Sequence, residues 1–218
     1  MTQQQFASRL LKPAVFAVAL IPLAMLVWNA LHDGLGANPV EAITFETGEW
    51  GLRFLLITLS VTPLRRISGW SVLVRLRRML GLFAFFYICL HFLTYLTLDA
   101  FFDLDYILED ITDRTYITLG FSSFLLLIAL AATSTDAMVR RLGGRRWRLL
   151  HKLAYAAALG GVLHFLWLVK VDLREPLIYL GILLVLFLAR VPAVAERLTK
   201  IRAPAGGKKA AAARQIAT

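Results

Sequence analysis

The sequence predicts an all-α protein, a polytopic membrane helix bundle of about six transmembrane helices with both termini in the cytoplasm. Three observations predict this fold class. Hydrophobic residues make up 59% of the chain and the mean hydropathy is +0.68, whereas soluble domains are roughly 45–50% apolar. Six runs are apolar over about the length that crosses a bilayer. The charged residues between these runs sort by sign.

The six apolar runs are residues 12–31, 49–64, 79–98, 116–133, 149–170 and 176–191, of which the second and the sixth are short. The first run follows a weakly basic start with Arg9 and Lys12, as a signal peptide would. It is long for a signal peptide, however, and no A-x-A cleavage site follows it. We therefore interpret it as a retained helix. The third run enters after Arg77 and Arg78 and ends at Asp99.

The loops between the runs fall into a basic set and an acidic set. Residues 1–12, 64–78, 134–152 and 190–218 hold 20 of the 24 Lys and Arg residues, and residues 31–53, 99–115 and 170–175 hold 12 of the 14 acidic ones. The positive-inside rule places the basic loops in the cytoplasm and the acidic loops outside. The net charge of +10 is thus mainly a topology signal. A nucleic-acid partner is not expected, because no nucleic-acid module is recognisable.

Three regions follow from this pattern: a cytoplasmic N-terminus (1–11), a transmembrane domain (12–191) and a basic cytoplasmic tail that we expect to be disordered (192–218). No Gly-rich phosphate loop occurs in the sequence, so electrons from a pyridine nucleotide would have to come through another protein. The single cysteine, Cys89, cannot form an internal disulfide. The acidic stretch 99–113 is either a solvated loop or a docking surface for a basic partner.

Three of the four histidines lie in or at the edge of the apolar runs, and His32 is in the first outer loop. His91 lies in the outer half of the third run. His164 is 13 residues, or about 20 Å of helix, beyond His151. Because the third and fifth runs both lead outward, His91 and His164 should lie at similar depth. Two neutral imidazoles at one depth can supply both axial ligands of a haem iron in a helical bundle.

His151 begins the fifth run near the cytoplasmic surface. A second haem at this depth would want another imidazole near Arg77 and Arg78, which are not histidines, so it would be five-coordinate, use Met79 or water, or be absent. His151 could be a ligand of the haem iron, a hydrogen-bonding or propionate-contacting residue, or a proton carrier, or it could have no functional role. The arginines mainly set the orientation, but Arg77, Arg78 and Arg148 lie at the right depth to hold haem propionates or a flavin phosphate.

Two other classes of function compete with a membrane cytochrome. Intramembrane histidines could relay protons or bind a divalent metal in a transporter. No acidic ligands lie within the apolar runs beside the histidines, and neither broken helices nor an inverted repeat is evident, which disfavours this class. The chain could also be a structural anchor for another protein.

Several stretches resemble a known family: GLGANPVEA (34–42), LRFLLITLSVTPLRR (52–66), RRMLGLFAFFYICLHFLTY (77–95), ALAATSTDAMVRRLGGRRWRLLHKLAY (129–155) and LHFLWLVK (163–170). They resemble the haem-binding membrane subunits of the bacterial periplasmic protein-methionine-sulfoxide reductase system, called MsrQ or YedZ, over roughly residues 25–190. The chain is more distantly similar to the transmembrane domain of ferric reductases and NADPH oxidases.

The resemblance implies a multi-pass protein of the bacterial inner membrane that binds haem b, in one or two copies, and FMN. It implies that electrons come from the quinone pool or a cytosolic flavin reductase. They would pass to a periplasmic, molybdopterin-containing catalytic subunit that reduces methionine sulfoxide, so this chain would not itself be an enzyme. His91, His151 and His164 correspond to the family's haem-associated histidines. The place of a fourth holds Arg77 and Arg78.

Overall fold

The computed structural model describes residues 7–202, and every regular element within them is helical, which confirms the predicted all-α class. The elements in chain order are the π-helical turn η1 (Ala7–Leu11), α2 (Lys12–Leu31), α3 (Pro39–Ser68), α4 (Leu73–Thr94), the π-helical turn η2 (Tyr95–Asp99), α5 (Leu104–Asp113), α6 (Thr115–Ala132), α7 (Asp136–Leu150), α8 (Leu153–Leu168), α9 (Arg174–Leu188) and α10 (Pro192–Arg202).

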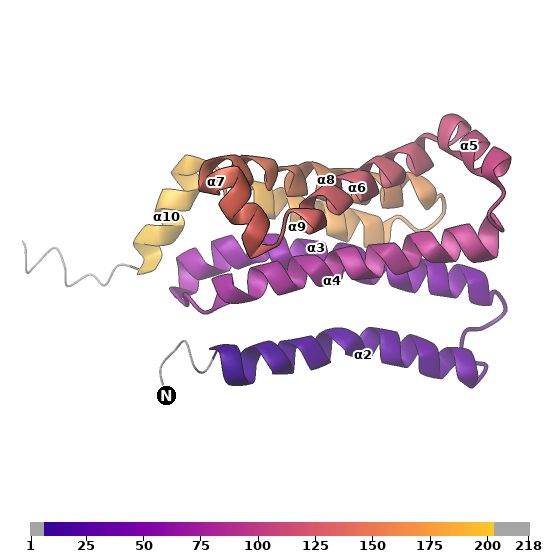
Figure 1. Ribbon diagram of the computed structural model, residues 1–218, viewed down its shortest axis with the longest axis horizontal. Helices are drawn as coiled ribbons and strands as arrows, with labels where there is room; N and C mark the ends of the chain where they lie inside the picture. The colour runs from indigo at the N-terminus through magenta and orange to yellow at the C-terminus, as the bar shows by residue number, and fades with distance from the viewer. Residues whose placement is uncertain (1–6, 203–218) are drawn as a thin grey trace, which may run out of the picture.

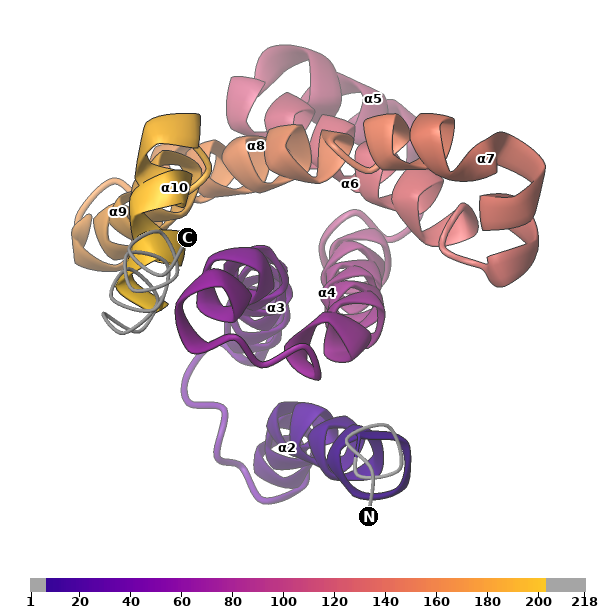
Figure 2. The ribbon, with the colours of Figure 1, turned by 90° about the vertical axis from the view of Figure 1, so that its left-hand side faces the viewer.

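The long helices run along one axis in three layers (Figures 1 and 2). Helix α2 forms one outer layer, α3 and α4 form the middle layer, and α6, α8 and α9 form the other outer layer. The helices pack most closely as two hairpins, α3 with α4 and α6 with α8. The connections 32–38, 99–114 and 169–173 lie together at the acidic end of the bundle, and the basic loops lie at the opposite, basic end.

Each of the six predicted spans lies on a helix, namely α2, α3, α4 with η2, α6, α8 and α9. Three helical stretches are long and apolar enough to cross a membrane, Arg9–Leu31, Leu73–Asp99 and Thr115–Ala132. The bent pairs α7 with α8 and α9 with α10 raise this number to five if each pair is one span. Helix α3 does not meet the same criterion, although its 30 residues are long enough.

Helix α3 can be more polar than its neighbours because it lies in the middle layer and is covered by protein. Its charged pair Glu49 and Arg53 forms an ion pair of 2.8 Å. Tyr179 of α9 joins this pair, since its hydroxyl donates to Glu49 Oε1 at 2.7 Å and accepts from Arg53 Nε at 2.8 Å. Ionisable groups within a membrane are normally paired in this way, and this pairing also holds α9 against α3.

The core and the surface are both apolar. Leu59, Ala84, Val162 and Leu183 are fully buried between the layers. On the outer layers Trp28 of α2 is 63% exposed and Val185 of α9 is 64% exposed. Large exposed apolar side chains on closed, internally hydrogen-bonded helices are suited to lipid. The chain is therefore a multi-pass membrane protein.

Three helices lie where the sequence predicted loops or a disordered tail. Helix α5 occupies the acidic stretch at 104–113, and α7 occupies the basic loop at 136–150, bent at Gly143, whose φ is 73°. Helix α10 covers 192–202, so the expectation of disorder is wrong for that part of the tail. Pro192 suits the first helical position and helix-forming residues follow it. The rest of the tail, 203–218, lies outside the described residues.

Candidate haem-binding site

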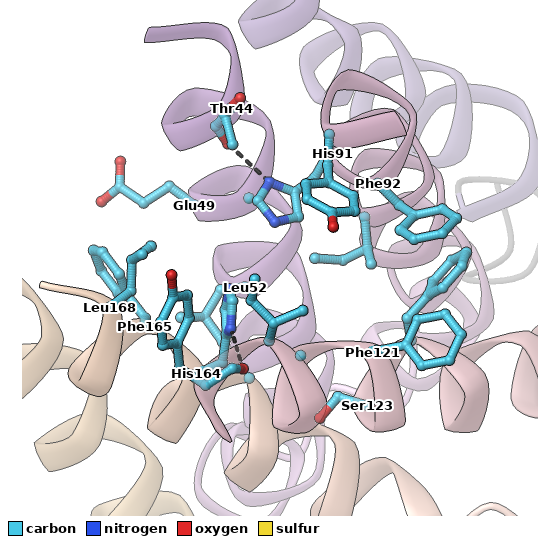
Figure 3. A pocket seen from close by; sticks show the side chains of 18 of the residues that line it. Thr44, Glu49, Leu52, His91, Phe92, Phe121, Ser123, His164, Phe165 and Leu168 are labelled. Atoms are coloured by element: carbon cyan, nitrogen blue, oxygen red, sulfur yellow. Dashed lines mark hydrogen bonds between the residues drawn. The ribbon is translucent and has the colours of Figure 1, made fainter. Parts of the chain in front are cut away.

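His91 of α4 and His164 of α8 face each other across a cavity between the two hairpins (Figure 3). Their ring centroids are 6.2 Å apart and their ring planes are inclined by 74°. The two side chains, which are expected at similar depth from the sequence, come from helices that run in the same direction. The structure thus brings together the two residues of the predicted outer haem site.

Each imidazole is oriented by a backbone carbonyl. His91 Nδ1 lies 2.9 Å from the carbonyl oxygen of Thr44, and His164 Nδ1 lies 2.7 Å from that of Tyr116. A carbonyl oxygen can only accept, so each Nδ1 carries the proton and donates. The other nitrogen, Nε2, then keeps its lone pair, which is the form that ligates metals.

Glycines make these two carbonyls accessible. A Cβ added at Gly48 would lie 2.9 Å from His91 Nδ1, and one at Gly120 would lie 2.8 Å from His164 Nδ1. Gly48 stands four residues after Thr44, and Gly120 stands four residues after Tyr116. A side chain at either position would cover the carbonyl that accepts the hydrogen bond, and glycine leaves it open. Sequence reasoning missed both glycines. In the sequence, both glycines share only one feature: each stands four residues after the residue whose carbonyl accepts from a histidine. That role of Thr44 and Tyr116 is known only from the folded protein.

The cavity encloses about 240 Å³. Its walls are mostly aliphatic and aromatic; Phe92 and Phe124 contribute rings whose centroids are 4.6 Å apart. Along each lining helix, the apolar residues Leu55, Leu127 and Ala157 lie toward the middle of the bundle. The charged lining residues Glu49, Asp99 and Arg114 lie toward the acidic end with Thr44, Tyr95 and Tyr116, whereas Ser123 lies deeper on α6.

The geometry fits the axial ligands of a haem iron. Metal–imidazole bonds are about 2 Å long and a ring centre lies roughly 1 Å beyond its nitrogen, so two axial rings have centres about 6 Å apart. The observed 6.2 Å agrees with this separation. Residues 7–202 contain no group of three or more His, Cys, Asp or Glu side chains placed to hold a metal ion. Two imidazoles are the donor set that a haem iron needs in addition to its macrocycle.

The other predicted site residues lie at the basic end. His151 is half-buried where α7 meets α8, and its ring stacks on Trp147 with centroids 4.0 Å apart. Its Nε2 lies 3.3 Å from Thr133 Oγ1. Arg77 and Arg78 lie in the first turns of α4, at the same end of the bundle as His151. None of them lines the His91–His164 cavity.

Arg78 is also held by an acidic partner. Its Nη2 lies 2.6 Å from Asp136 Oδ1 at the start of α7. The hydrogen bond and charge of Arg78 lower the pKa of Asp136 below its ordinary value. Because both side chains are largely exposed, this pair fixes the position of α7 only weakly.

The helical bundle and its paired histidines define a membrane protein of the ferric-reductase type. The family described as ferric reductase like transmembrane component matches residues 47–162. A protein-methionine-sulfoxide reductase heme-binding subunit MsrQ from Herminiimonas arsenicoxydans is 52% identical, with 90% of this chain and 91% of the relative covered. MsrQ of Rhodospirillum rubrum is 55% identical over 87% of this chain and 91% of its own length. The chain belongs to the MsrQ family. The predicted resemblance is confirmed, and the transporter alternative is not favoured.

Proposed function

We propose that this chain is the haem b electron-transfer subunit of a protein-methionine-sulfoxide reductase system in the bacterial inner membrane. It takes electrons from the quinone pool or a cytosolic flavin reductase. It passes them to a periplasmic, molybdopterin-containing catalytic subunit, and so supports the repair of oxidised periplasmic proteins. The observation that carries this proposal is the pair His91 and His164, with facing rings 6.2 Å apart and both Nδ1 atoms bonded to backbone carbonyls.

His91 and His164 would hold the iron of haem b through Nε2. The bound haem would supply a one-electron carrier. A haem held by two protein ligands is suited to electron transfer and not to binding a substrate on the metal. This chain therefore transfers electrons, and catalysis takes place in the separate subunit.

The carbonyls of Thr44 and Tyr116 keep both imidazoles in the ligating tautomer. The walls of the cavity are mostly apolar, and the residues that form them lie largely on helices. A site with little freedom to reorganise is suited to electron transfer. Its apolar surroundings contribute to the reduction potential of the bound haem.

At the basic end, His151, Arg77 and Arg78 form the second cofactor region of the proposal. Their positive charges suit haem propionates or the phosphate of FMN, which the family resemblance implies. In the observed arrangement His151 makes a hydrogen-bonding contact with Thr133. We place this end in the cytoplasm, where the electron donor binds, and the His91–His164 cavity toward the periplasm.

The test is the haem content per chain, with oxidised and reduced spectra, of the purified wild type and its histidine variants. We expect His91→Ala and His164→Ala each to lose the same low-spin haem, because either change removes one axial ligand. His32→Ala is the matched control, since this exposed histidine should not change the haem content. His151→Ala shows whether a second haem exists.

A wild type that takes up no haem with ample haem supplied would refute the proposed function. Full haem content in His91→Ala and His164→Ala would refute the assignment of these two ligands.

A further inference from the structure

Arg114 is the only Lys or Arg among the residues that line the cavity. It stands between α5 and α6 at the acidic end of the bundle, toward which the charged lining residues lie. Its side chain is 47% exposed, so it lies between the cavity and the aqueous surface. A positive charge at this position is suited to pair with an anion in the cavity.

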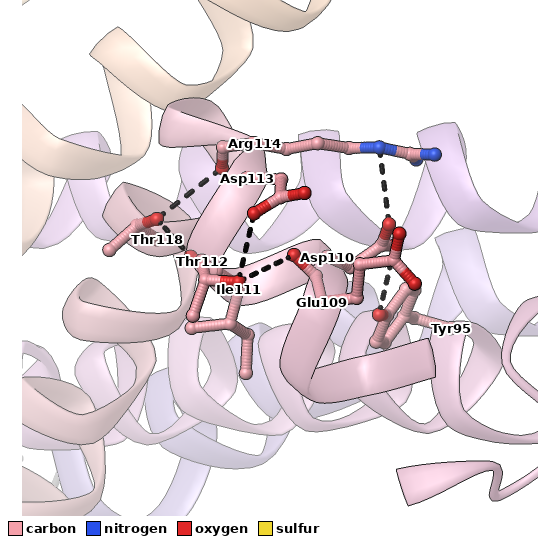
Figure 4. A network of polar contacts seen from close by, with 8 residues as sticks. All are labelled: Tyr95, Glu109, Asp110, Ile111, Thr112, Asp113, Arg114 and Thr118. Carbon is pink, nitrogen blue, oxygen red and sulfur yellow. Dashed lines mark hydrogen bonds and ion pairs between the residues drawn. The ribbon is translucent and has the colours of Figure 1, made fainter. Parts of the chain in front are cut away.

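One side of the Arg114 guanidinium is already held by protein (Figure 4). Its Nε lies 3.1 Å from Asp110 Oδ1. Asp110 is only 3% exposed, and its other oxygen accepts from the Tyr95 hydroxyl at 3.1 Å. A guanidinium has five N–H donors in a planar fork. The contact with Asp110 therefore fixes the side chain and leaves the terminal amino groups for other acceptors.

Arg114 is also linked to the second haem ligand. It stands two residues before Tyr116, whose ring centroid is 6.0 Å from that of His164. The carbonyl of the same Tyr116 accepts from His164 Nδ1. Arg114 thus lines the cavity on the side that positions His164.

A haem b brings two carboxylates into this cavity. An ionised carboxylate among apolar side chains is costly unless it is paired. The apolar part of the cavity lies toward the middle of the bundle, so the carboxylate edge of the haem must face the acidic end. The acids there add negative charge, and of these Glu49 is already paired with Arg53 at 2.8 Å. Arg114 is the lining cation that remains for a haem carboxylate.

We propose that Arg114, held by Asp110, binds a carboxylate of the haem b through its terminal amino groups and so fixes which edge of the haem faces the acidic end. This inference rests on the proposed function, because it needs a haem between His91 and His164. Arg114 is then a cofactor-binding residue that is distinct from the arginines of the basic end.

The experiment measures how fast the haem leaves the full-length protein. Protein made in a haem-deficient host is loaded in detergent with haem b or with its dimethyl ester, whose carboxylates are neutral. Loss is followed by transfer to apomyoglobin. Loss of a hydrogen bond to a charged group weakens binding by about tenfold or more. We therefore expect Arg114→Gln to lose haem b at least tenfold faster than the wild type.

The dimethyl ester distinguishes direct binding from an indirect effect on the fold. It should leave the wild type and Arg114→Gln at the same rate, because it has no charge for Arg114 to bind. Arg174→Gln is the matched control: it removes an exposed arginine from the same end that does not line the cavity. Its loss of haem b should be unchanged. Arg114→Lys keeps the positive charge but lacks the planar guanidinium group, so its rate of haem b loss should lie between those of the wild type and Arg114→Gln.

Two outcomes would count against the inference. Equal acceleration for haem b and its ester in Arg114→Gln would show that Arg114 acts only through the fold. Loss of haem b at the wild-type rate would show that no carboxylate is bound there. If Arg114→Gln does not accumulate, the rates at which Arg114→Lys loses haem b and its dimethyl ester are compared with those of the wild type in the same way. A wild type that takes up neither form of haem would instead refute the proposed function itself.

Discussion

His91 and His164 are held in the same way, although they come from different helical hairpins. In each hairpin the histidine is on the second helix, and it donates through Nδ1 to a carbonyl on the first helix. Gly48 and Gly120 leave room for the imidazole at that carbonyl. At the scale of residues, the site is therefore two copies of one arrangement that face each other.

The glycines give a direct prediction. Gly48→Ala and Gly120→Ala each place a methyl group less than 3.0 Å from an imidazole nitrogen, so the ring must move and its Nδ1 hydrogen bond must weaken. We expect each variant to hold haem with lower occupancy and to show a larger high-spin fraction in its oxidised spectrum. Haem content and absorbance of the purified variants measure this.

Gly181→Ala is the control for the glycine variants. Gly181 lies inside α9, and nothing is within 4 Å of an added Cβ. Alanine is also the better helix former, so haem content and spectrum should be those of the wild type. Wild-type spectra in both Gly48→Ala and Gly120→Ala would contradict the account of how the histidines are oriented.

The sequence contains enough information to predict that His91 and His164 lie at one depth, because helix direction and residue spacing determine depth in a membrane. It does not reveal that Gly48, Gly120 and Arg114 line the cavity between them. Their roles depend on which helix faces which, and a helix position alone does not determine that. His151 illustrates the same limit: its place near the basic end follows from the sequence, but its contacts with Thr133 and Trp147 depend on the turn between α7 and α8.

At the scale of elements, α2 and α4 are joined by one buried hydroxyl. Tyr87 of α4 is 1% exposed, and its hydroxyl donates to the carbonyl of Ala19 at 2.8 Å and accepts from the amide of Leu23 at 3.2 Å. An unbroken helix would pair these two backbone groups with each other. Pro22 lies between them, and a proline disturbs the helical hydrogen bonds around it. Tyr87 thus completes the backbone bonding of α2 at its proline.

Tyr87→Phe removes this bridge and leaves buried backbone groups without their partner. We expect a loss of about 1–3 kcal/mol in the free energy of unfolding, seen as a lower Tm of the purified protein in detergent. The haem spectrum of the folded variant should be unchanged, because Tyr87 does not line the cavity. An unaltered Tm would show that the Tyr87 bridge does not stabilise the bundle.

Hydropathy predicted the positions of the membrane helices well, since lipid requires apolar residues over a fixed length. It did not predict α5, α7 or α10, because these helices lie outside the apolar runs and carry many charges. Helix α5 begins with the Asp103 side chain accepting from the amides of Asp105 and Tyr106, which is an ordinary capping signal. Because this stretch contains several aspartates, the sequence alone does not show which of them caps a helix.

At the scale of the whole molecule, the charges and the position of the proposed haem site agree with one direction of electron flow. The charged residues that line the His91–His164 cavity lie toward the acidic end, and His151, Arg77 and Arg78 lie at the basic end. With the basic end in the cytoplasm, electrons would enter near these three residues and leave near the cavity. The helices between the two ends hold both regions in fixed positions within apolar surroundings.

The central claim is that His91 and His164 bind one haem iron from both sides. The most direct measurement is the low-temperature electron paramagnetic resonance spectrum of the oxidised wild-type protein. Ring planes inclined by 74° would leave two d orbitals of a bound iron nearly equal in energy, so we expect a strongly anisotropic low-spin signal that disappears in His91→Ala and in His164→Ala. A high-spin signal alone, or a low-spin signal that survives both substitutions, would contradict the claim.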